Sequence, residues 1–230
     1  AYAATQRGFR AEVVMPTNAI EAKVQAVNTY GGTVHFCEPT QQAREAGLAE
    51  WVSQGLIAIP PYDHPHIIQG QGTAALELME QISTLDVIVA PIGGGGLISG
   101  TALAALTQPK GSRPRVIGIE PKGADDTYRS LIQGHRVSDH HPETIADGLR
   151  AFVGELNFAL IQAHVDDVLC VSESQITEAM AMLMKDLKQV IEPSGAVPFA
   201  GLLAHPDRFQ GQRVGVILSG GNMNLPTLIP

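Results

Sequence analysis

The apolar positions in the first sixty residues alternate between two spacings. Short runs rich in β-branched residues are typical of strands, and apolar residues three or four positions apart are typical of helices. These patterns predict helix, strand, helix, strand, helix and strand at 1–6, 12–16, 19–30, 33–37, 41–54 and 56–59. Strands joined through helices pair in parallel, so we expect a small βαβαβ domain at 1–60. The rigid pair Pro60-Pro61 marks its boundary.

The remaining residues continue the alternation, and we expect them to form a larger domain at 61–230. A helix is predicted at 67–82, with an interruption at the glycine-containing stretch 69–72. Further strands are predicted at 87–92, 115–120, 168–171 and 213–218, and further helices at 97–106, 126–133, 155–164, 173–190 and 196–204. Ser172 and Gln175 have the spacing of a capping box. The fold class is α/β, with parallel-rich sheets flanked by helices.

The stretch Asp86–Leu106 carries the most specific pattern. Its apolar strand ends in four consecutive glycines, Gly93–Gly96, and a helical pattern begins at Leu97. A loop without Cβ atoms can close on a phosphate, and its N–H groups join the unpaired donors at the positive end of the helix. A plain turn needs only one or two glycines, and ordering four is costly. The sequence therefore favours a phosphate site.

The spacing of the glycines argues against two nucleotide motifs. The dinucleotide-binding motif G-x-G-x-x-G has variable residues between its glycines, and this stretch has none. A Walker loop ends in Gly-Lys-Ser/Thr, which does not follow here. A nucleotide-binding oxidoreductase is therefore a disfavoured alternative.

Composition narrows the class of protein. Hydrophobic residues make up 44% of the 230 positions and aromatic residues only 5%, which suits an aliphatic core. The net charge of −8 argues against a nucleic-acid-binding surface. No apolar run approaches the ~20 residues of a membrane span. Cys37 and Cys170 lie far apart in apolar runs, so we expect buried, reduced thiols in a cytoplasmic protein.

Ligands of parallel α/β sheets bind beyond the carboxyl ends of the strands. Four segments with suitable chemistry follow predicted strands or lie between them: Gly93–Gly96, Glu120–Asp126, Thr144–Gly148 and Ser219–Asn222. We expect them to converge on one cleft that binds a flat, phosphorylated cofactor.

Four motifs occur in order along nearly the whole chain. They are Gly70-Gln-Gly-Thr73, Pro91-Ile-Gly-Gly-Gly-Gly-Leu97, Glu192-Pro-Ser-Gly-Ala196 and Leu218-Ser-Gly-Gly-Asn222. Each motif is weak alone, but the ordered set resembles the fold-type II pyridoxal phosphate (PLP) enzymes, and within them the serine/threonine dehydratases and serine racemases. The resemblance implies a two-domain architecture with PLP as cofactor.

The resemblance also implies roles for individual residues. The tetraglycine loop of the family holds the cofactor phosphate, which implies a site formed by Gly93, Gly94, Gly95, Gly96 and Leu97. Gly148 would line the cofactor ring. Ser219, followed by Gly220, would bond the pyridine nitrogen through its hydroxyl. A neutral partner leaves that nitrogen less protonated than a carboxylate would, which favours loss of a β-hydroxyl over transamination. A simple turn is the alternative role of Ser219.

The segment 120–126 is similar to the divalent-metal site of serine racemases and metal-activated serine dehydratases. The resemblance implies carboxylate ligands from Glu120 and Asp126 and a backbone carbonyl ligand from Ala124. Hard oxygen ligands suit Mg²⁺, Ca²⁺ or Mn²⁺, with water completing the shell. We expect a structural or activating ion outside the bond-breaking step. Two solvated surface acids are the alternative.

The family's cofactor-linked lysine precedes the position that corresponds to Ala1. We therefore expect no catalytic residue in this chain and no turnover by it alone. None of its lysines resembles that motif: Lys23, Lys110, Lys122, Lys185 and Lys188.

The resemblance implies β-elimination of L-serine or L-threonine to a 2-oxo acid and ammonia. It further implies a small amino-acid substrate and, by analogy, a homodimer. A serine racemase is the near alternative, and a non-catalytic cofactor-binding protein is the more distant one.

Overall fold

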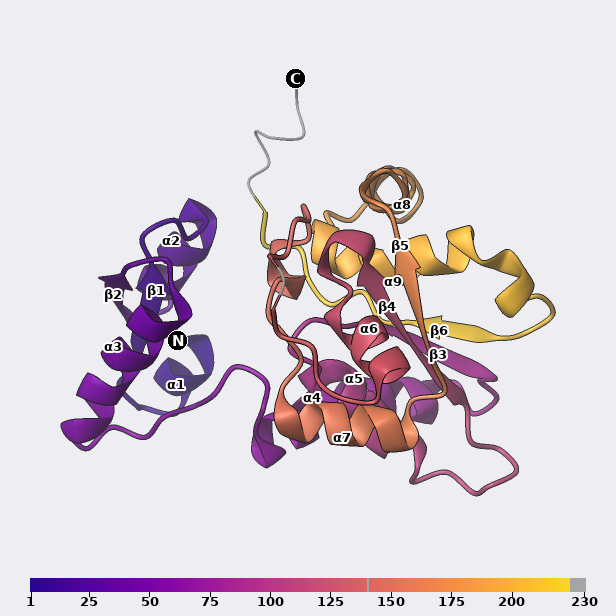
Figure 1. Ribbon diagram of the computed structural model, residues 1–230, viewed down its shortest axis with the longest axis horizontal. Coiled ribbons are helices and arrows are strands. Elements are labelled where there is room, and N and C mark those ends of the chain that lie inside the picture. Colours follow the sequence, from indigo (N-terminus) through magenta and orange to yellow (C-terminus); the bar gives the residue numbers. More distant parts are fainter. Residues whose placement is uncertain (140, 224–230) are drawn as a thin grey trace. The chain divides into compact units, whose positions relative to one another are not determined.

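The computed structural model describes residues 1–139 and 141–223. The chain divides into two compact units, of which one contains Ala1–Ile59 and the other is Pro60–Gly221 (Figure 1). Residues 140 and 224–230 of the larger domain expected from the sequence lie outside the described residues.

The first unit follows the predicted order over most of its length. Its elements are α1 (Tyr2–Gln6), β1 (Glu12–Pro16), α2 (Glu21–Thr29), β2 (Thr33–Cys37) and α3 (Gln41–Ser53). The strands β1 and β2 pair in parallel, in a register that places Glu12 beside Thr33 and Pro16 beside Cys37. The helix α2 supplies the crossover between them, as the alternation of spacings predicts.

The strand predicted at 56–59 is wrong. This segment has no regular secondary structure and pairs with no strand among the described residues, and the sheet of this unit has two strands. Ile57 is 90% exposed and Ile59 is 74% exposed. A short apolar run supplies strand propensity, but a strand also needs a neighbour for its backbone hydrogen bonds. After α1, the unit therefore has the order βαβα in place of the predicted βαβαβ.

The second unit is a four-stranded parallel sheet with helices on both faces. Its strands are β3 (Val87–Pro91), β4 (Arg115–Pro121), β5 (Asp167–Val171) and β6 (Val214–Val216), in the order β5-β4-β3-β6. Its α-helices are α4 (Pro65–Gln81), α5 (Gly96–Ala105), α6 (Asp126–Gln133), α7 (Glu155–His164), α8 (Glu173–Leu187) and α9 (Pro193–Ala204). Short 3₁₀ turns are η1 (Lys122–Ala124), η2 (Asp147–Leu149) and η3 (Pro206–Arg208).

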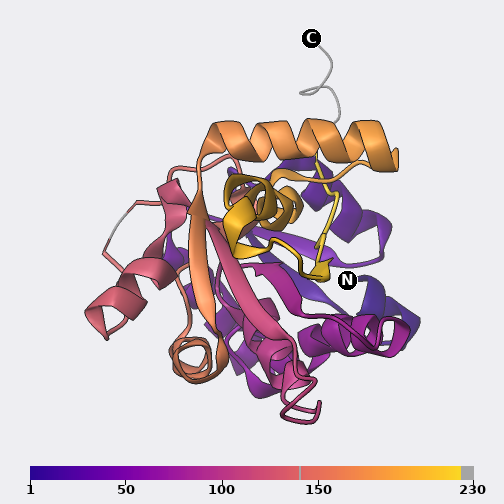
Figure 2. The same ribbon diagram turned by 90° about the vertical axis from the view of Figure 1, so that its right-hand side faces the viewer.

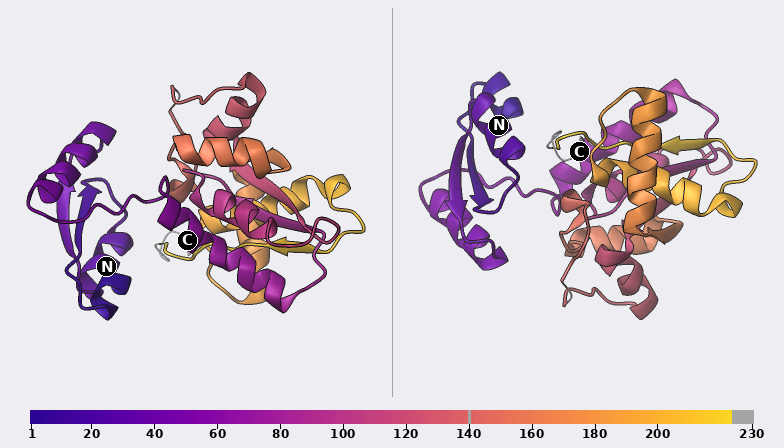
Figure 3. Two further views of the ribbon diagram at one scale, coloured as in Figure 1. Left: turned by 90° about the horizontal axis from the view of Figure 1, so that it is seen from below. Right: turned by 90° about the horizontal axis from the view of Figure 1, so that it is seen from above.

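The helices form two layers around this sheet. The helix α5 packs on β3 and β4 and is itself packed by α4 and α7, whereas α9 packs on the sheet and is covered by α8. Figures 1 and 2 show α8 and α9 together beside the sheet, and the two views of Figure 3 look onto the opposite helical layers. Central parallel strands covered in this way are buried on both faces. All five residues of β3 are buried accordingly.

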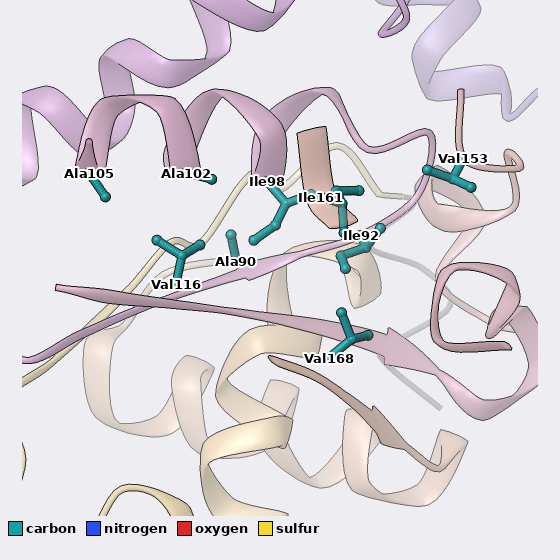
Figure 4. Close-up of a cluster of buried hydrophobic side chains, with 9 residues drawn as sticks. All are labelled: Ala90, Ile92, Ile98, Ala102, Ala105, Val116, Val153, Ile161 and Val168. Atoms are coloured by element: carbon teal, nitrogen blue, oxygen red, sulfur yellow. The ribbon is translucent and has the colours of Figure 1, made fainter. Parts of the chain in front are cut away.

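The core of the second unit lies between the sheet and α5. Figure 4 shows small and branched side chains of α5, among them Ile98 and Ala102, facing Ala90 of β3 and Val116 of β4. Alanines on the helix let it approach the strands closely, so the start of α5 is held rigidly at the carboxyl end of β3.

Three helices of the second unit differ most from the sequence prediction. The helix α4 runs from Pro65 without the interruption expected near Gly70 and Gly72, because α5 packs closely against it there: a Cβ on Gly72 would lie 2.7 Å from the Gly100 carbonyl oxygen. The helix α9 begins at Pro193, a residue suited to the first helical turn. The helix α8 ends at Leu187, because Lys188 adopts a left-handed conformation with φ of 58°.

Candidate cofactor site

The four glycines connect the end of β3 to the start of α5. Gly93–Gly96 are all buried, and Gly95 has a φ of 92°, which L-residues with a side chain rarely adopt. The Ser99 N–H donates to the Gly95 carbonyl oxygen at 3.0 Å, which is the first bond of the helix. The N–H groups before Ser99 therefore have no partner within α5. No acidic residue lies in the first turn, so the positive end of the helix dipole is uncompensated there.

Close packing explains why glycine occupies each position of the loop. A Cβ on Gly94 would lie 2.3 Å from the ring of Tyr62, and one on Gly96 would lie 2.1 Å from Gln71 Oε1. A Cβ on Gly95 would lie 2.8 Å from the Cβ of Asn157. The loop backbone is thus enclosed by side chains, and a turn with ordinary residues would not fit.

The motifs that are distant in sequence meet beside this loop. A Cβ on Gly93 would lie 3.1 Å from the Gly148 carbonyl oxygen, and the Gly148 N–H donates to Ser194 Oγ at 3.0 Å. The neighbouring Gly195 approaches Gly220, since a Cβ on Gly195 would lie 2.8 Å from the Gly220 carbonyl oxygen. The structure therefore brings the glycine loop, the segment ending at Gly148 and the Ser219-Gly220 pair together.

Four residues of the candidate site remain accessible. Leu97 and Gly220 are half-buried, and Gly148 and Ser219 are exposed. A buried loop of backbone N–H groups with accessible groups beside it suits a phosphorylated ring. The residues present therefore fit PLP.

Sequence reasoning assigned no role to Tyr62, Asp63 or Asn157, which support the glycine loop. Asn157 is fully buried on α7, and its side-chain N–H donates to the Gly94 carbonyl oxygen at 2.9 Å. A signal was present in the sequence. Asn157 and Ile161 are one helical turn apart on the buried face of α7, and a polar residue at a core position usually has a specific partner.

The acid segment lies at the carboxyl end of β4. Glu120 is completely buried, and its carboxylate accepts the backbone N–H groups of Thr127 at 3.1 Å and Tyr128 at 2.8 Å. Asp126 is 2% exposed and accepts the Val153 N–H at 2.8 Å. Val153 also packs near Gly95, so this segment adjoins the glycine loop. The two acids are thus not solvated surface groups.

Burial has a large effect on the ionisation of both acids. Loss of water around Glu120, followed by the repulsion of the Asp126 carboxylate, raises the pKa of Glu120 to about 8. Burial also raises the pKa of Asp126 to about 6, against the hydrogen bond from Val153. Two carboxylates that are costly to ionise together fit a site for a cation, which would offset both charges.

No group of three or more His, Cys, Asp or Glu side chains that could hold a metal is present in residues 1–139 and 141–223. The predicted ligand set has only two such side chains, Glu120 and Asp126. Its third ligand is the backbone carbonyl of Ala124, a residue that is 1% exposed. The donors fit a hard divalent cation, and the metal site stays a prediction.

Residues 1–220 match the family described as pyridoxal-phosphate dependent enzyme. The chain belongs to this family. The match confirms the family resemblance, the α/β fold class and the expectation of PLP as cofactor, whereas the individual cofactor-binding residues stay predictions.

Relatives within the family are similar over almost the whole chain. A β-hydroxyaspartate dehydratase of Paracoccus denitrificans is 45% identical, over 99% of this chain and 72% of the relative. A serine racemase of Dictyostelium discoideum is 42% identical, over 99% of this chain and 71% of the relative. The structure of maize serine racemase superposes with a TM-score of 0.93 at 40% identity, over 99% of this chain and 70% of that one.

Two further expectations concern membrane-spanning helices and the two cysteines. The described helices include none that is long and apolar enough to cross a membrane. Cys37 and Cys170 are free thiols but only half-buried, so the expectation of full burial is wrong for both. Each lies on a strand with one side open, which explains the remaining exposure.

Proposed function

We propose that the protein is a PLP-dependent ammonia-lyase of β-hydroxy-α-amino acids. Its substrates are L-serine and L-threonine, with 3-hydroxyaspartate as a further member of the same chemical class. The observation that carries the proposal is the buried loop Gly93–Gly96 at the start of α5, in a chain of the PLP family whose relatives include a β-hydroxyaspartate dehydratase.

PLP, when bound, withdraws electrons from the α-carbon of an amino acid, which makes the α-proton removable and a β-hydroxyl a leaving group. The N–H groups of Gly93–Gly96 and Leu97 hold its phosphate at the positive end of α5. Gly148 would line the ring, and a side chain at this position would meet Ser194. The Ser219 hydroxyl hydrogen-bonds the pyridine nitrogen, with Gly220 beside it.

The choice of a serine at position 219 bears on the outcome of the reaction. A hydroxyl cannot stabilise a protonated pyridine nitrogen as a carboxylate does, since it carries no charge. A neutral Ser219 hydroxyl would thus make bound PLP a weaker electron sink, which would favour loss of a β-hydroxyl over transamination. The enamine released in this way hydrolyses to a 2-oxo acid and ammonia.

Serine racemization is the second candidate. The observation that favours it is the similarity to the serine racemases of Dictyostelium and maize at 42% and 40% identity. Both reactions begin with removal of the α-proton, and they differ in whether the proton returns or the hydroxyl leaves.

We also propose that Glu120, Asp126 and the Ala124 carbonyl hold a divalent cation such as Mg²⁺, Ca²⁺ or Mn²⁺. The support is the burial of both carboxylates and their raised pKa values. The ion neutralises the pair and stabilises the loop from Glu120 to Asp126, apart from the reacting atoms.

The decisive experiment supplies PLP and Mg²⁺ to the protein expressed from its complete gene. L-Serine, L-threonine and 3-hydroxyaspartate are compared by release of 2-oxo acid and ammonia, and D-serine is measured in parallel. Ammonia in equal amount to 2-oxo acid, exceeding D-serine, supports the lyase. D-Serine as the main product would favour the racemase, and neither product from a PLP-loaded protein would exclude both.

A further inference from the structure

The start of α7 is bound to the glycine loop through a single carbonyl group. The Gly94 carbonyl oxygen accepts the Gly154 N–H at 3.1 Å and the side-chain N–H of Asn157 at 2.9 Å. The same Asn157 side chain also donates to the Tyr62 carbonyl oxygen at 3.3 Å. One buried amide therefore joins two segments that are 32 positions apart in the sequence.

The Asp63 carboxylate holds the backbone of Asn157. The helix α7 has glycine at its N-cap, so it lacks a capping side chain of its own. The Asp63 carboxylate supplies the cap, accepting the Glu155 N–H at 3.0 Å and the Asn157 N–H at 3.1 Å. A negative charge at this end of the helix is also favourable for the helix dipole. The position of Asn157 is thus set by its backbone as well as by its side chain.

The geometry of a peptide unit gives this contact a consequence for the loop. The Gly94–Gly95 peptide is trans, so its N–H points opposite to its carbonyl group. Holding the Gly94 carbonyl toward α7 therefore turns the Gly95 N–H away from α7. Rotation of a peptide between two glycines meets little steric resistance, since neither residue has a Cβ. The direction of this N–H depends on an external partner.

The chemistry of the contact requires an amide at position 157. Both neighbours of the side chain are carbonyl oxygens, so only a donor is tolerated. The Oδ1 atom on the other side of the amide is buried without a hydrogen-bond partner among the described residues. An unsatisfied buried oxygen is unfavourable, so the donor side must provide a compensating benefit.

We propose that Asn157 is a positioning residue of the phosphate site. It holds the Gly94–Gly95 peptide in the orientation that presents the Gly95 N–H to the cofactor phosphate. The inference rests on the proposed binding of the phosphate by the loop, and it adds a residue on α7 that the motifs of the site do not contain.

The test compares affinity for PLP with affinity for pyridoxal, which lacks the phosphate. Asn157→Asp keeps the shape of the side chain but places an acceptor against both carbonyls, and Asn157→Leu fills similar space without a donor. We expect each variant to bind PLP about 10- to 100-fold more weakly, the effect of one charge-assisted hydrogen bond, and pyridoxal within about twofold of the wild type. The ³¹P resonance of bound PLP should move toward that of free PLP.

Ile176→Ala is the matched control, because Ile176 is fully buried on α8 and its truncation lowers stability without touching the loop. It should keep the wild-type preference for PLP. Wild-type affinity and ³¹P shift in both Asn157 variants would overturn the role of Asn157 and leave the proposed function intact. A wild-type protein that binds PLP no better than pyridoxal would overturn both. If Asn157→Asp does not fold, Asn157→Leu still decides the question.

Discussion

The backbone N–H of Gly148 donates a hydrogen bond to the hydroxyl of Ser194 over 3.0 Å, although the two residues are 46 positions apart. Ser194 lies in the first turn of α9 and is 4% exposed. The bond fixes η2 against α9, so that Gly148 lies between Ser194 and Gly93. Ser194 in the first turn of α9 therefore positions the segment that we propose lines the cofactor ring.

Replacement of this serine tests the relationship. Ser194→Ala removes the acceptor and leaves the Gly148 N–H without it, so we expect a loss of about 1 kcal/mol in the free energy of unfolding. The absorption band of bound PLP should broaden or shift, since Gly148, which we propose lines the ring, is no longer fixed by Ser194. Urea unfolding and the visible spectrum measure the two effects. An unchanged spectrum at wild-type stability would contradict the role given to Ser194.

The glycine loop should not accept even the smallest side chain. Gly95→Ala places a Cβ 2.8 Å from Asn157 at a φ of 92°, so we expect destabilisation of about 2–3 kcal/mol and loss of PLP binding. Gly111→Ala is the matched control, because a Cβ at Gly111 has nothing within 4 Å. Its stability should stay within about 0.5 kcal/mol of the wild type. Thermal unfolding and PLP titration would reveal any tolerance of Gly95→Ala.

The contact between α4 and α5 is tested by two glycine variants whose effects on stability should have opposite signs. Gly72→Ala would bring a Cβ to 2.7 Å from the Gly100 carbonyl oxygen, which should force the helices apart and cost about 1–3 kcal/mol. Gly70, one half-turn earlier on α4, faces open space. Gly70→Ala should therefore stabilise the helix by about 0.5–1 kcal/mol. The two values come from denaturant unfolding, and equal signs would refute the packing argument.

The sequence predicted those parts of the fold that depend on local spacing. The periodicity within β3 and α5 and the capping box of Ser172 identified elements that the structure confirms, because a buried strand or a cap is encoded by neighbouring residues. The segment 56–59 failed for the opposite reason, since a strand also requires a partner that its own residues do not specify. The unbroken helix through Gly70 and Gly72 likewise depends on α5, which lies far along the chain.

The candidate site shows the same division. The glycine loop was found because its residues are consecutive and their chemistry is distinctive. Asn157 and Asp63 were missed as supports of the loop, because a contact over more than 60 positions leaves no spacing to recognise. The polarity of Asn157 on the buried face of α7 was the available signal.

The proposed metal site can be tested by replacing its two carboxylates. Glu120→Gln and Asp126→Asn each remove a negatively charged oxygen ligand. Glu120→Gln also places an amide NH₂ group against the backbone N–H groups that donate hydrogen bonds to Glu120. We expect each variant to lose about 1–3 kcal/mol of stability and any thermal stabilisation by Mg²⁺ or Ca²⁺. Asp125→Asn is the control, because Asp125 is paired with Arg129 and is not a predicted ligand. A wild-type response to metal in both ligand variants would refute the assignment.

The raised pKa of Glu120 predicts how stability depends on pH when metal is removed. The carboxyl group has an ordinary pKa of 4.5 and a pKa of about 8 in the folded protein, so between these values the folded state keeps a proton that the unfolded chain has lost. Unfolding then releases a proton, and stability must fall as pH rises from about 4.5 to 8. The shift limits the loss from Glu120 to about 5 kcal/mol.

Asp126, raised to about 6, contributes in the same direction. In EDTA, urea unfolding at pH 5, 6, 7 and 8 should therefore show a steady decline. Saturating Mg²⁺ should flatten it, because the cation replaces the protons. Other groups titrate in this range, so the comparison is with Glu120→Gln, which cannot ionise and should have the shallower slope. If the wild type and Glu120→Gln decline in parallel, Glu120 is already ionised in the folded protein and the burial of its charge is offset by a partner other than a metal.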